Sequence, residues 1–489
     1  MAYLKDLLKQ VTYICTRGTM DCKVTHICHD SRQVVRGSMF ICLAGSREDG
    51  HDYLAQAIRK GAAVCVVSKH VWVEGDVTVI RVRNTSEAMA WIARNYYGAP
   101  AEAMQMIGIT GTKGKTTTAC MLYQMLKEAG VKCGLIGTLG IRRSDGLKKP
   151  GSNTTPDALV LQKELREMAD AGCSCCVMEV SSQGLKMHRV AGIVFDYGIF
   201  TNLSPDHIGP NEHASFEEYQ ECKSLLFRQC KEGIVNADDE HVDGIIKNHT
   251  CKLHTFSCKK DADLMAGAVG YLDEEGQIGM HFTTTGCMNV YAVVHIPGSF
   301  SVYNSLVTML TCHLAGISDE AILRGLDKVK VRGRVELVPV SKDFTVIIDY
   351  AHNEVSTRSV LTTLKEYHPK RLICVYGGGG NRSKLRRYDM GEVTGELADL
   401  SVLTCDNPRD EEIRDINNDI KIGLAKSNGK YIEIDDRKAA IKYCIENAKK
   451  GDMIVLLGKG HEDYQEIKGV KYHFDEREAI AEVKKELNL

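Results

Sequence analysis

The stretch MIGITGTKGKTTT, residues 106–118, limits what this chain can fold into more than any other part of it. A short apolar run enters a glycine-rich loop, Lys115 and three threonines follow, and a helical pattern then covers residues 119–128. The glycines of the loop region are Gly108, Gly111 and Gly114. A strand, a glycine loop and a helix N-terminus in this order aim backbone N–H groups at a phosphate chain. The sequence therefore predicts a phosphate-binding turn.

Residue chemistry suggests roles inside this loop. Lys115 would reach the β- and γ-phosphates of a nucleotide, and the Thr116 hydroxyl would ligate Mg²⁺. The longer pattern G-x-x-x-x-G-K-[ST] fails, because Ile109 stands five residues before Gly114, and the chain carries the shorter G-T-x-G-K-T. The alternative interpretation is a glycine-rich turn that caps an ordinary helix.

Length and charge narrow the class of protein. At 489 residues the chain exceeds one hydrophobic core and predicts roughly two to four domains. A net charge of −2 gives no footprint for nucleic acid or an anionic membrane. No apolar run approaches the roughly 20 residues that cross a bilayer, and the first residues do not form a signal peptide. The 19 scattered cysteines favour reduced thiols in a cytoplasmic protein over a disulfide framework or a zinc site.

In the central segment, about 103–332, apolar runs repeatedly end in polar residues. Glu179 follows the run CCVM, and His207 follows YGIF with a short loop between them. The carboxyl ends of parallel strands meet at one edge of a sheet. Glu179 and His207 are therefore candidate metal ligands facing the same phosphate as Lys115. The alternative for each is a solvated loop residue.

Lys223 lies on the apolar stripe of a predicted helix. Ser215 and Glu218 form an S-x-x-E capping box that opens this helix, and Lys223 falls seven residues after Phe216 on its buried face. A buried lysine must pair with an anion, stay neutral or be modified. A neutral amine can take up CO₂ to become a carbamate, which is an oxygen ligand for Mg²⁺. The alternative is a side chain that extends to solvent.

From about residue 334 the pattern becomes regular strand–helix units. Four apolar runs end in polar or glycine residues: FTVIIDYAHN, RLICVYGGGGN, LSVLTCDNPR and DMIVLLGKGHE. Helical patterns lie at 357–367, 388–397 and 437–449. This predicts a compact Rossmann-like domain with all four polar ends on one edge. The residues expected to converge there are Asp349, His352, Asn407, Arg409, His461 and Glu462. A basic cluster over 382–387 either holds carboxylates or phosphates or is a solvated face.

Together these motifs resemble those of the Mur ligases, in the same order along nearly the whole chain. They are GTKGKTTT, NTTPD, EVSSQGLKMHRV, TNLSPDH, CKSLLF, NADD, RGRVE, DYAH, DNPR and GKGHE. The resemblance implies an α/β fold with three domains. These are a UDP-sugar-binding domain over 1–102, a central P-loop ATPase with a mostly parallel sheet over 103–332, and a Rossmann-like domain for the incoming amino acid over 333–489.

The resemblance implies ATP-dependent amide formation in peptidoglycan precursor synthesis. The D-Glu carboxylate of UDP-MurNAc-L-Ala-D-Glu would be joined to an amino group. A carboxylate is inert toward amines until it is phosphorylated, so the site must align it with the γ-phosphate and neutralise charge with metal ions. The amine then attacks the acyl phosphate, and phosphate leaves.

Site residues follow from the matching motifs. Predicted ATP contacts are Gly111, Thr112, Lys113, Gly114, Lys115, Thr116, Thr117, Asn304, Arg334 and Asp349. Thr116 and Glu179 would hold one Mg²⁺, and His207 and carbamylated Lys223 the other, so the predicted catalytic residues are Lys115, Glu179, His207 and Lys223. Predicted contacts to the UDP-MurNAc-dipeptide are Ser31, Asn153, Thr154, Thr155, Ser181 and Arg189. Those to the amino acid are Arg387, Asp406, Asn407, Arg409, Gly458 and Glu462.

The motif DNPR, residues 406–409, resembles the variant associated with meso-diaminopimelate, with L-lysine as the alternative amino acid. Arg409 and Arg387 can pair the second carboxylate of diaminopimelate in a fork, while Glu462 accepts from its ammonium. The chain departs from the family pattern at IGPNEH after His207, and at Lys113, Met187, Ser301 and Asn381. These departures bear on the substrate more than on the reaction type.

Two other functions remain open at this stage. A folylpolyglutamate-synthase-like ligase would share the central and C-terminal folds, but it gives no reason for the DSR segment at 30–32. A non-catalytic paralogue that binds nucleotide is motivated by the departures, while intact Lys115, Glu179, His207 and Lys223 argue against it. We expect a monomer.

Overall fold

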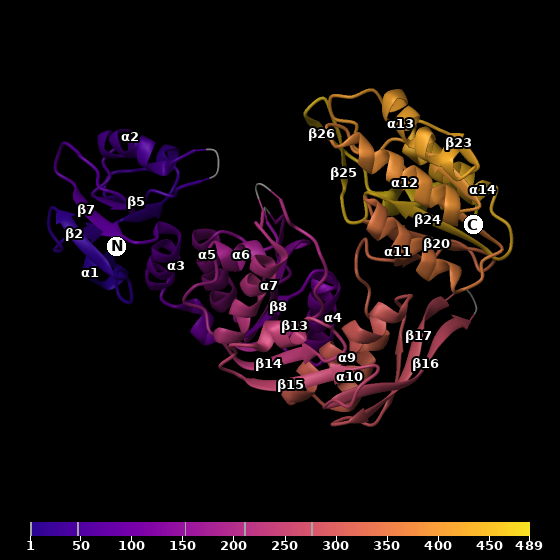
Figure 1. Ribbon diagram of the computed structural model, residues 1–489, viewed down its shortest axis with the longest axis horizontal. Coiled ribbons are helices and arrows are strands. Elements are labelled where there is room, and N and C mark those ends of the chain that lie inside the picture. The colour runs from indigo at the N-terminus through magenta and orange to yellow at the C-terminus, as the bar shows by residue number, and fades with distance from the viewer. Residues whose placement is uncertain (1, 46–47, 152, 210–211, 275–276) are drawn as a thin grey trace. The chain divides into compact units, whose positions relative to one another are not determined.

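The computed structural model describes residues 2–489 except 46–47, 152, 210–211 and 275–276 (Figure 1). The chain forms two compact units. One is Met1–Met265 with Leu306–Gly325, and the other is Ala266–Ser305 with Leu326–Leu489. The expected domain boundaries at 102 and 332 stay predictions.

The N-terminal sheet has the order β2-β7-β6-β5-β4, in which β4 to β7 are parallel and β2 is an antiparallel edge. Its segment contains β1 (Ala2–Tyr3), α1 (Leu4–Leu7), β2 (Tyr13–Arg17), β3 (Lys23–Val24), β4 (His26–Cys28), η1 (Ser31–Gln33), β5 (Ser38–Ile41), η2 (Gly50–Tyr53), α2 (Leu54–Arg59), β6 (Val64–Val67), β7 (Thr78–Val82), α3 (Thr85–Tyr96) and η3 (Pro100–Ala103). Side chains alternate along the strands, so Met39 packs with α1 and α3 while Phe40 packs with α2.

The central sheet places the phosphate loop. Its elements in the first unit are β8 (Gln105–Thr110), α4 (Lys115–Glu128), β9 (Cys133–Gly137), β10 (Gly140–Arg142), β11 (Lys148–Lys149), α5 (Ala158–Asp170), β12 (Cys175–Glu179), α6 (Ser182–Lys186), β13 (Phe195–Phe200), α7 (Phe216–Ser224), η4 (Leu225–Arg228), β14 (Cys230–Asn236), α8 (Val242–Ile246) and β15 (Lys252–Ser257). Strands β9-β12-β8-β13-β14-β15 are parallel neighbours in this order. The polar residues after β8, β12 and β13 therefore share one edge of the sheet.

Three elements run from one unit into the other. They are β16 (Leu264–Glu274), α9 (Ser299–Leu314) and α10 (Asp319–Asp327). In the second unit β17 (Gln277–Gly286) pairs antiparallel with β18 (Tyr291–Val294).

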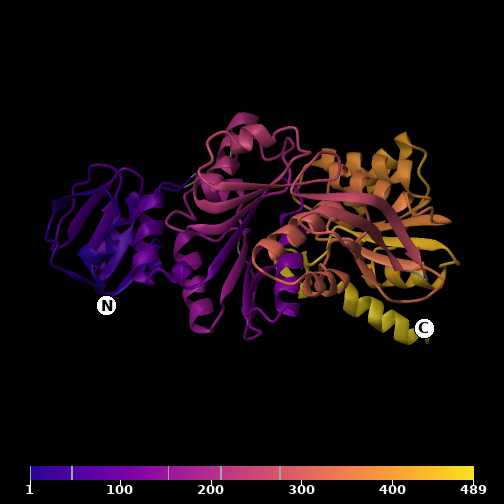
Figure 2. The same ribbon diagram turned by 90° about the horizontal axis from the view of Figure 1, so that it is seen from below.

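The C-terminal sheet has the order β19-β20-β24-β21-β22-β23, and all strands except β19 are parallel. Its segment contains β19 (Glu336–Val338), β20 (Thr345–Asp349), α11 (Glu354–Lys365), β21 (Arg371–Tyr376), α12 (Lys384–Leu397), β22 (Leu400–Leu403), α13 (Ile413–Lys426), β23 (Tyr431–Glu433), α14 (Arg437–Glu446), β24 (Asp452–Leu457), β25 (Tyr464–Ile467), β26 (Val470–His473) and α15 (Glu476–Glu486). Helices α11, α12 and α13 cover one face and α14 and α15 the other, and α15 carries the C-terminus (Figure 2).

The expected α/β fold class with mostly parallel sheets is confirmed. The four buried strands expected after residue 334 are β20, β21, β22 and β24. Helix α13 and strands β19 and β23 were not expected, and α13 becomes important for the site. Among the described residues, none of the helices has both the length and the apolar character of a membrane span. All 19 cysteines are described, and none of them forms a disulfide.

Candidate active site

The glycine loop is anchored by the residues that follow β13. The Thr112 N–H donates to the Asn202 carbonyl (2.8 Å), and the Lys113 N–H donates to the Asn202 side-chain oxygen (3.0 Å). Gly111 has φ +148°, and a Cβ on this residue would collide with the Thr201 side chain, so only glycine fits. Helix α4 starts directly after Gly114, which leaves its first N–H groups at the loop.

Lys115 lies over this loop. Its Nζ donates to the carbonyl oxygens of Gly111 (2.8 Å) and Thr112 (3.0 Å). Thr117, on the same first turn of α4, is buried. The ammonium thus stands where a phosphate chain bound to the loop would meet it.

A chain of hydroxyls runs from α4 to the NTT segment through Glu179. Thr116 donates to Glu179 Oε2 (2.9 Å), and Thr138 donates to the same carboxylate through its N–H (2.8 Å) and its hydroxyl (3.1 Å). The Thr154 hydroxyl lies 3.1 Å from that of Thr138 and must be the donor, because Thr138 gives its only hydroxyl proton to Glu179. Glu179 is 2% exposed, so this carboxylate is held rigidly beside the loop.

Lys223 is buried at the same loop and does not reach solvent. Its side chain is 1% exposed, its Nζ donates to the Gly111 carbonyl (2.8 Å), and it lies 4.3 Å from the ring centre of Tyr219. Burial lowers the pKa of the Lys223 amine well below its ordinary value, and the positive charge of Lys115 lowers it further. Both amines donate to the same Gly111 carbonyl, and this proximity of two positive charges disfavours the charged form of Lys223.

The capping box before Lys223 forms with one difference. Ser215 accepts from the Glu218 N–H (3.2 Å), while Glu218 accepts from the Ala214 N–H (2.6 Å) instead of that of Ser215. Helix α7 therefore starts where the sequence indicates and places Lys223 on its buried face.

His207 follows a different pattern from the other predicted metal ligands. Half of its side chain is exposed, and its Nδ1 lies 2.9 Å from Glu212 Oε1. Its ring centre lies 6.2 Å from that of Tyr219, whose hydroxyl donates to Thr112. Tyr219 therefore links His207 to the loop: its ring lies beside that of His207, and its hydroxyl binds Thr112. The IGPNEH departure falls partly on residues 210–211, which lie outside the described residues.

Most of the residues expected to contact the UDP-MurNAc-dipeptide gather next to Glu179. Thr155 donates to the Glu179 carbonyl (2.9 Å) and accepts from the Ser181 N–H (2.9 Å), and Arg189 donates to the Thr155 carbonyl (2.8 Å). Arg189 Nη2 also lies 3.4 Å from the Met187 sulfur. Asn153 is exposed just before this group. Ser31 lies apart on η1, where its hydroxyl donates to Gln56 (2.9 Å).

The donor set beside the loop suits Mg²⁺. This ion prefers oxygen ligands and keeps water and substrate phosphate in its shell. Thr116 and Glu179 provide a hydroxyl and a buried carboxylate in contact with each other. Among the described residues, His, Cys, Asp and Glu form no cluster of three or more that could cage an ion. The oxygen atoms of Thr116 and Glu179 are the type of ligand that Mg²⁺ prefers.

Three predicted ATP contacts belong to the second unit. Asn304 is buried on α9. The Asp349 carboxylate accepts from the N–H groups of Val335 (2.8 Å) and Ala351 (2.7 Å), and the Arg334 guanidinium lies 5.0 Å from the Tyr350 ring centre. Burial raises the pKa of Asp349, against the opposing effect of Arg334. Their contact with nucleotide stays a prediction.

The residues predicted to bind the amino-acid substrate lie at the carboxyl ends of β22 and β24. Asn407 Nδ2 donates to Glu462 Oε2 (2.8 Å), and the Nζ of buried Lys459 lies 3.5 Å from Asp406 Oδ1 and 3.4 Å from Glu462 Oε2. Gly458 has φ +104°, and a Cβ there would stand 3.0 Å from Asp406 Oδ2. Distant segments of sequence thus form one polar cluster.

The two arginines of the expected carboxylate fork already hold carboxylates of the protein. Arg387 donates to both oxygens of Glu411 (2.7 and 2.8 Å), to Asp419 (2.9 Å) and to the Gly379 carbonyl. Arg409 donates through Nε to Glu466 (3.1 Å) and through Nη1 to the Gly380 carbonyl (2.7 Å). Arg387 is 3% exposed and Arg409 is 23% exposed, so Arg409 is the more accessible to a ligand.

Sequence reasoning missed several residues that shape the site. Asn202 lies inside the motif TNLSPDH, but no role in the site was predicted for Asn202 or Tyr219. Thr138 follows the apolar run of β9, the same signal that identified Glu179. Lys459 lies inside GKGHE, but neither its burial nor its partners follow from local sequence.

Three family models match the chain. They are "Mur ligase family, catalytic domain" over 23–97, "Mur ligase middle domain" over 109–312 and "Mur ligase, glutamate ligase domain" over 333–460. Together with these matches, the phosphate loop on its parallel sheet identifies the chain as an ATP-dependent amide ligase. The chain belongs to the Mur ligase family.

Relatives match over the full length. A UDP-N-acetylmuramoyl-L-alanyl-D-glutamate–2,6-diaminopimelate ligase of Clostridium tetani is 41% identical, covering 99% of each chain. A solved structure of a UDP-N-acetylmuramoyl-L-alanyl-D-glutamate–2,6-diaminopimelate ligase is 29% identical, with TM-score 0.71 over 95% of this chain and 96% of that one. A folylpolyglutamate synthase of Mycobacterium tuberculosis, complexed with ADP and AMPPCP, is 16% identical, with TM-score 0.60 over 76% of this chain and 92% of the other. That last likeness shows the fold alone.

Proposed function

We propose that this ligase joins diaminopimelate to the D-Glu carboxylate of UDP-MurNAc-L-Ala-D-Glu, with ATP converted to ADP and phosphate, in peptidoglycan precursor synthesis. The observation that carries the proposal is the cluster of Asn407, Arg409 and Glu462 at one sheet edge. It offers a cation for a carboxylate and a carboxylate for an ammonium, which are the two groups at the far end of diaminopimelate. The names of the full-length relatives support the same substrate.

The chemistry of the loop supports the activation step. N–H groups of the loop and α4 would bind the phosphates, and Lys115 would neutralise charge that develops on the γ-phosphate as it moves to the substrate carboxylate. Thr116 and Glu179 would hold one Mg²⁺, which supplies positive charge to the phosphates. The amine then attacks the acyl phosphate, and phosphate departs.

Carbamylated Lys223 is part of this proposal. Its burial beside Lys115 and its position on the loop favour a neutral amine that can add CO₂, and the resulting carbamate would provide oxygen with His207 for a second Mg²⁺. The UDP-MurNAc-dipeptide would lie along Thr154, Thr155, Ser181 and Arg189, with Ser31 and Asn153 as further contacts. We further propose the three domains 1–102, 103–332 and 333–489, and a monomer acting in the cytoplasm.

Turnover with defined amino acids tests the proposal. The protein is incubated with ATP, Mg²⁺ and UDP-MurNAc-L-Ala-D-Glu, and meso-diaminopimelate or L-lysine is added separately while ADP release is followed. We expect release with diaminopimelate to exceed that with lysine, and none without the dipeptide. Preference for lysine would replace the amino acid in the proposal. No release with any amino acid would support the non-catalytic paralogue instead.

A further inference from the structure

Lys459 is a fully buried cation at the centre of the amino-acid cluster. Its side chain is 0% exposed, and Nζ lies 3.2 Å from Asn407 Oδ1, 3.4 Å from Glu462 Oε2 and 3.5 Å from Asp406 Oδ1. Burying an ammonium is costly unless it is paired and hydrogen-bonded. Lys459 satisfies this condition by contacting three of the residues expected to bind the amino acid, and its Nζ also lies 5.6 Å from the ring centre of Tyr464.

These contacts set the direction of the Glu462 carboxylate. Oε2 accepts from Lys459 and from Asn407 Nδ2 (2.8 Å). Within the described part of the chain, no hydrogen bond to Oε1 is found, and the Glu462 side chain is 14% exposed. One oxygen is therefore fixed from inside, and the other is left for a ligand.

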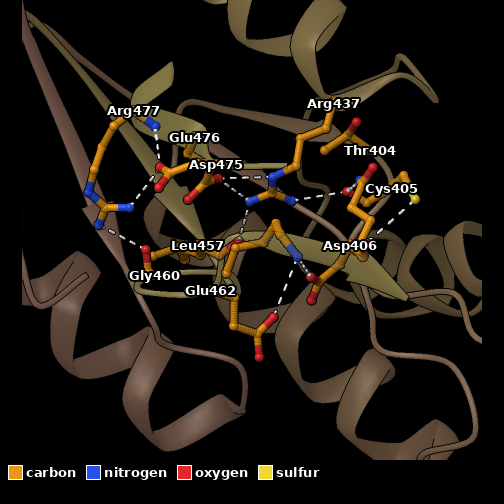
Figure 3. A network of polar contacts seen from close by, with 12 residues as sticks. Thr404, Cys405, Asp406, Arg437, Leu457, Gly460, Glu462, Asp475, Glu476 and Arg477 are labelled. Atoms are coloured by element: carbon orange, nitrogen blue, oxygen red, sulfur yellow. Dashed lines mark hydrogen bonds and ion pairs between the residues drawn. The ribbon is translucent and has the colours of Figure 1, made fainter. Parts of the chain in front are cut away.

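The charges of the buried cluster also favour a cationic ligand. Arg437 holds the ends of β22 and β24 together, because it donates to the Cys405 carbonyl (3.2 Å) and the Leu457 carbonyl (2.7 Å), and it pairs with Glu476 (Figure 3). Arg437 and Lys459 thus face the carboxylates of Asp406, Glu462 and Glu476. One carboxylate is in excess, and an ammonium at Glu462 would balance it.

We propose that Lys459 is a positioning residue that fixes Glu462 to accept the second ammonium of a diamino acid, and that it thereby contributes to amino-acid selectivity. This inference rests on the proposed function, because it takes the Glu462 cluster as the amino-acid site. Lys459 itself does not touch the reacting atoms.

A cycle of two substrates and two enzymes tests the inference. 2-Aminopimelate keeps the distal carboxylate of diaminopimelate but lacks the second amine. For the wild-type enzyme we expect kcat/KM for diaminopimelate to exceed that for 2-aminopimelate by roughly tenfold to a hundredfold, the range of a charge-assisted hydrogen bond. In Lys459→Met this ratio should fall toward one, while KM for ATP changes by less than about twofold. A purely structural role of Lys459 would lower kcat/KM for both amino acids by the same factor, and the ratio would stay at its wild-type value.

Two further variants complete the design. Glu462→Gln alters a partly exposed side chain and should also bring the ratio toward one. Arg371→Met, a control in the same sheet, breaks the pair with Asp452 at the opposite end of β21 and β24, and should keep the wild-type ratio. If Lys459→Met fails to fold in a thermal melt, Lys459→Gln takes its place. A wild-type ratio in the Lys459 variant or in Glu462→Gln would overturn the inference. Wild-type enzyme that turns over neither amino acid would instead refute the proposed function.

Discussion

The phosphate loop and the amino-acid cluster both lie at the carboxyl ends of parallel strands, but they are held by different forces. The loop is fixed by backbone hydrogen bonds, by Asn202 and by the threonine chain to Glu179. The amino-acid cluster is fixed by buried ion pairs, including Lys459 with Asp406 and Arg387 with Asp419. Loss of a loop residue should therefore reduce activity at little cost in stability, whereas loss of a buried cluster residue such as Arg387 or Lys459 should reduce both activity and stability.

Substitution of Lys223 gives the largest expected effect on the loop side of this comparison. Lys223→Ala removes the proposed carbamate and should reduce kcat by roughly a thousandfold, the scale of losing one preorganised charge-stabilising group. Millimolar acetate should partly restore turnover by supplying an oxygen ligand. Lys223→Arg, which cannot form a carbamate, should be equally impaired, and Lys231→Ala, an exposed lysine paired with Asp196, should be fully active. Full activity of Lys223→Arg would exclude the carbamate.

Substitutions of Arg409 and Arg387 should have the next largest effects, and comparing them separates amino-acid binding from fold stability. Arg409→Met should raise KM for diaminopimelate by about tenfold to a hundredfold, because a charge-assisted contact is lost. Arg387→Met should also destabilise the fold by about 1–3 kcal/mol, since it leaves Asp419, 9% exposed, with Lys384 (3.4 Å) as its remaining ion-pair partner. Steady-state kinetics and chemical denaturation of both variants measure the difference. Equal stability of the two would contradict the assigned roles.

The difference between the regions also explains what the sequence could predict. The loop, the α7 cap and buried Lys223 follow from residues close in sequence, where spacing determines geometry. The engagement of Arg387 by Glu411 and Asp419 could not be predicted in this way, because Asp419 lies on α13, whose narrow stripe Ile416, Ile420 and Leu424 is surrounded by charged residues. Lys459 likewise could not be placed from local sequence, because its partners Asp406 and Asn407 lie about 50 residues away. The order of β22, β21 and β24 in the sheet brings them together.

His461, next to the cluster, gives the smallest effect and tests whether buried charge governs stability there. Burial lowers the pKa of its imidazole to about 4, helped by Arg334, Arg332 and Arg477 and opposed by Asp463. In the unfolded chain the same group titrates near 6.5. Between pH 6.5 and 4 the unfolded state therefore binds a proton that the native state does not. The free energy of unfolding is therefore unaffected by this group above pH 6.5, and it falls by about 1.4 kcal/mol for each pH unit between 6.5 and 4.

His461→Asn removes this titration and isolates its contribution. Hydrogen-exchange protection of β24 is compared between wild type and variant at pH 7.5 and at pH 5, so that intrinsic exchange rates cancel at each pH. When the pH is lowered from 7.5 to 5, the free energy of unfolding of the variant should rise by about 2 kcal/mol relative to that of wild type. The shift should be confined to the second unit, because His461 packs against Tyr350, with ring centres 4.7 Å apart, inside that unit. A pH-independent difference would mean that the ion pairs around His461 adjust to its charge, and that the cluster is less rigid than its buried contacts indicate.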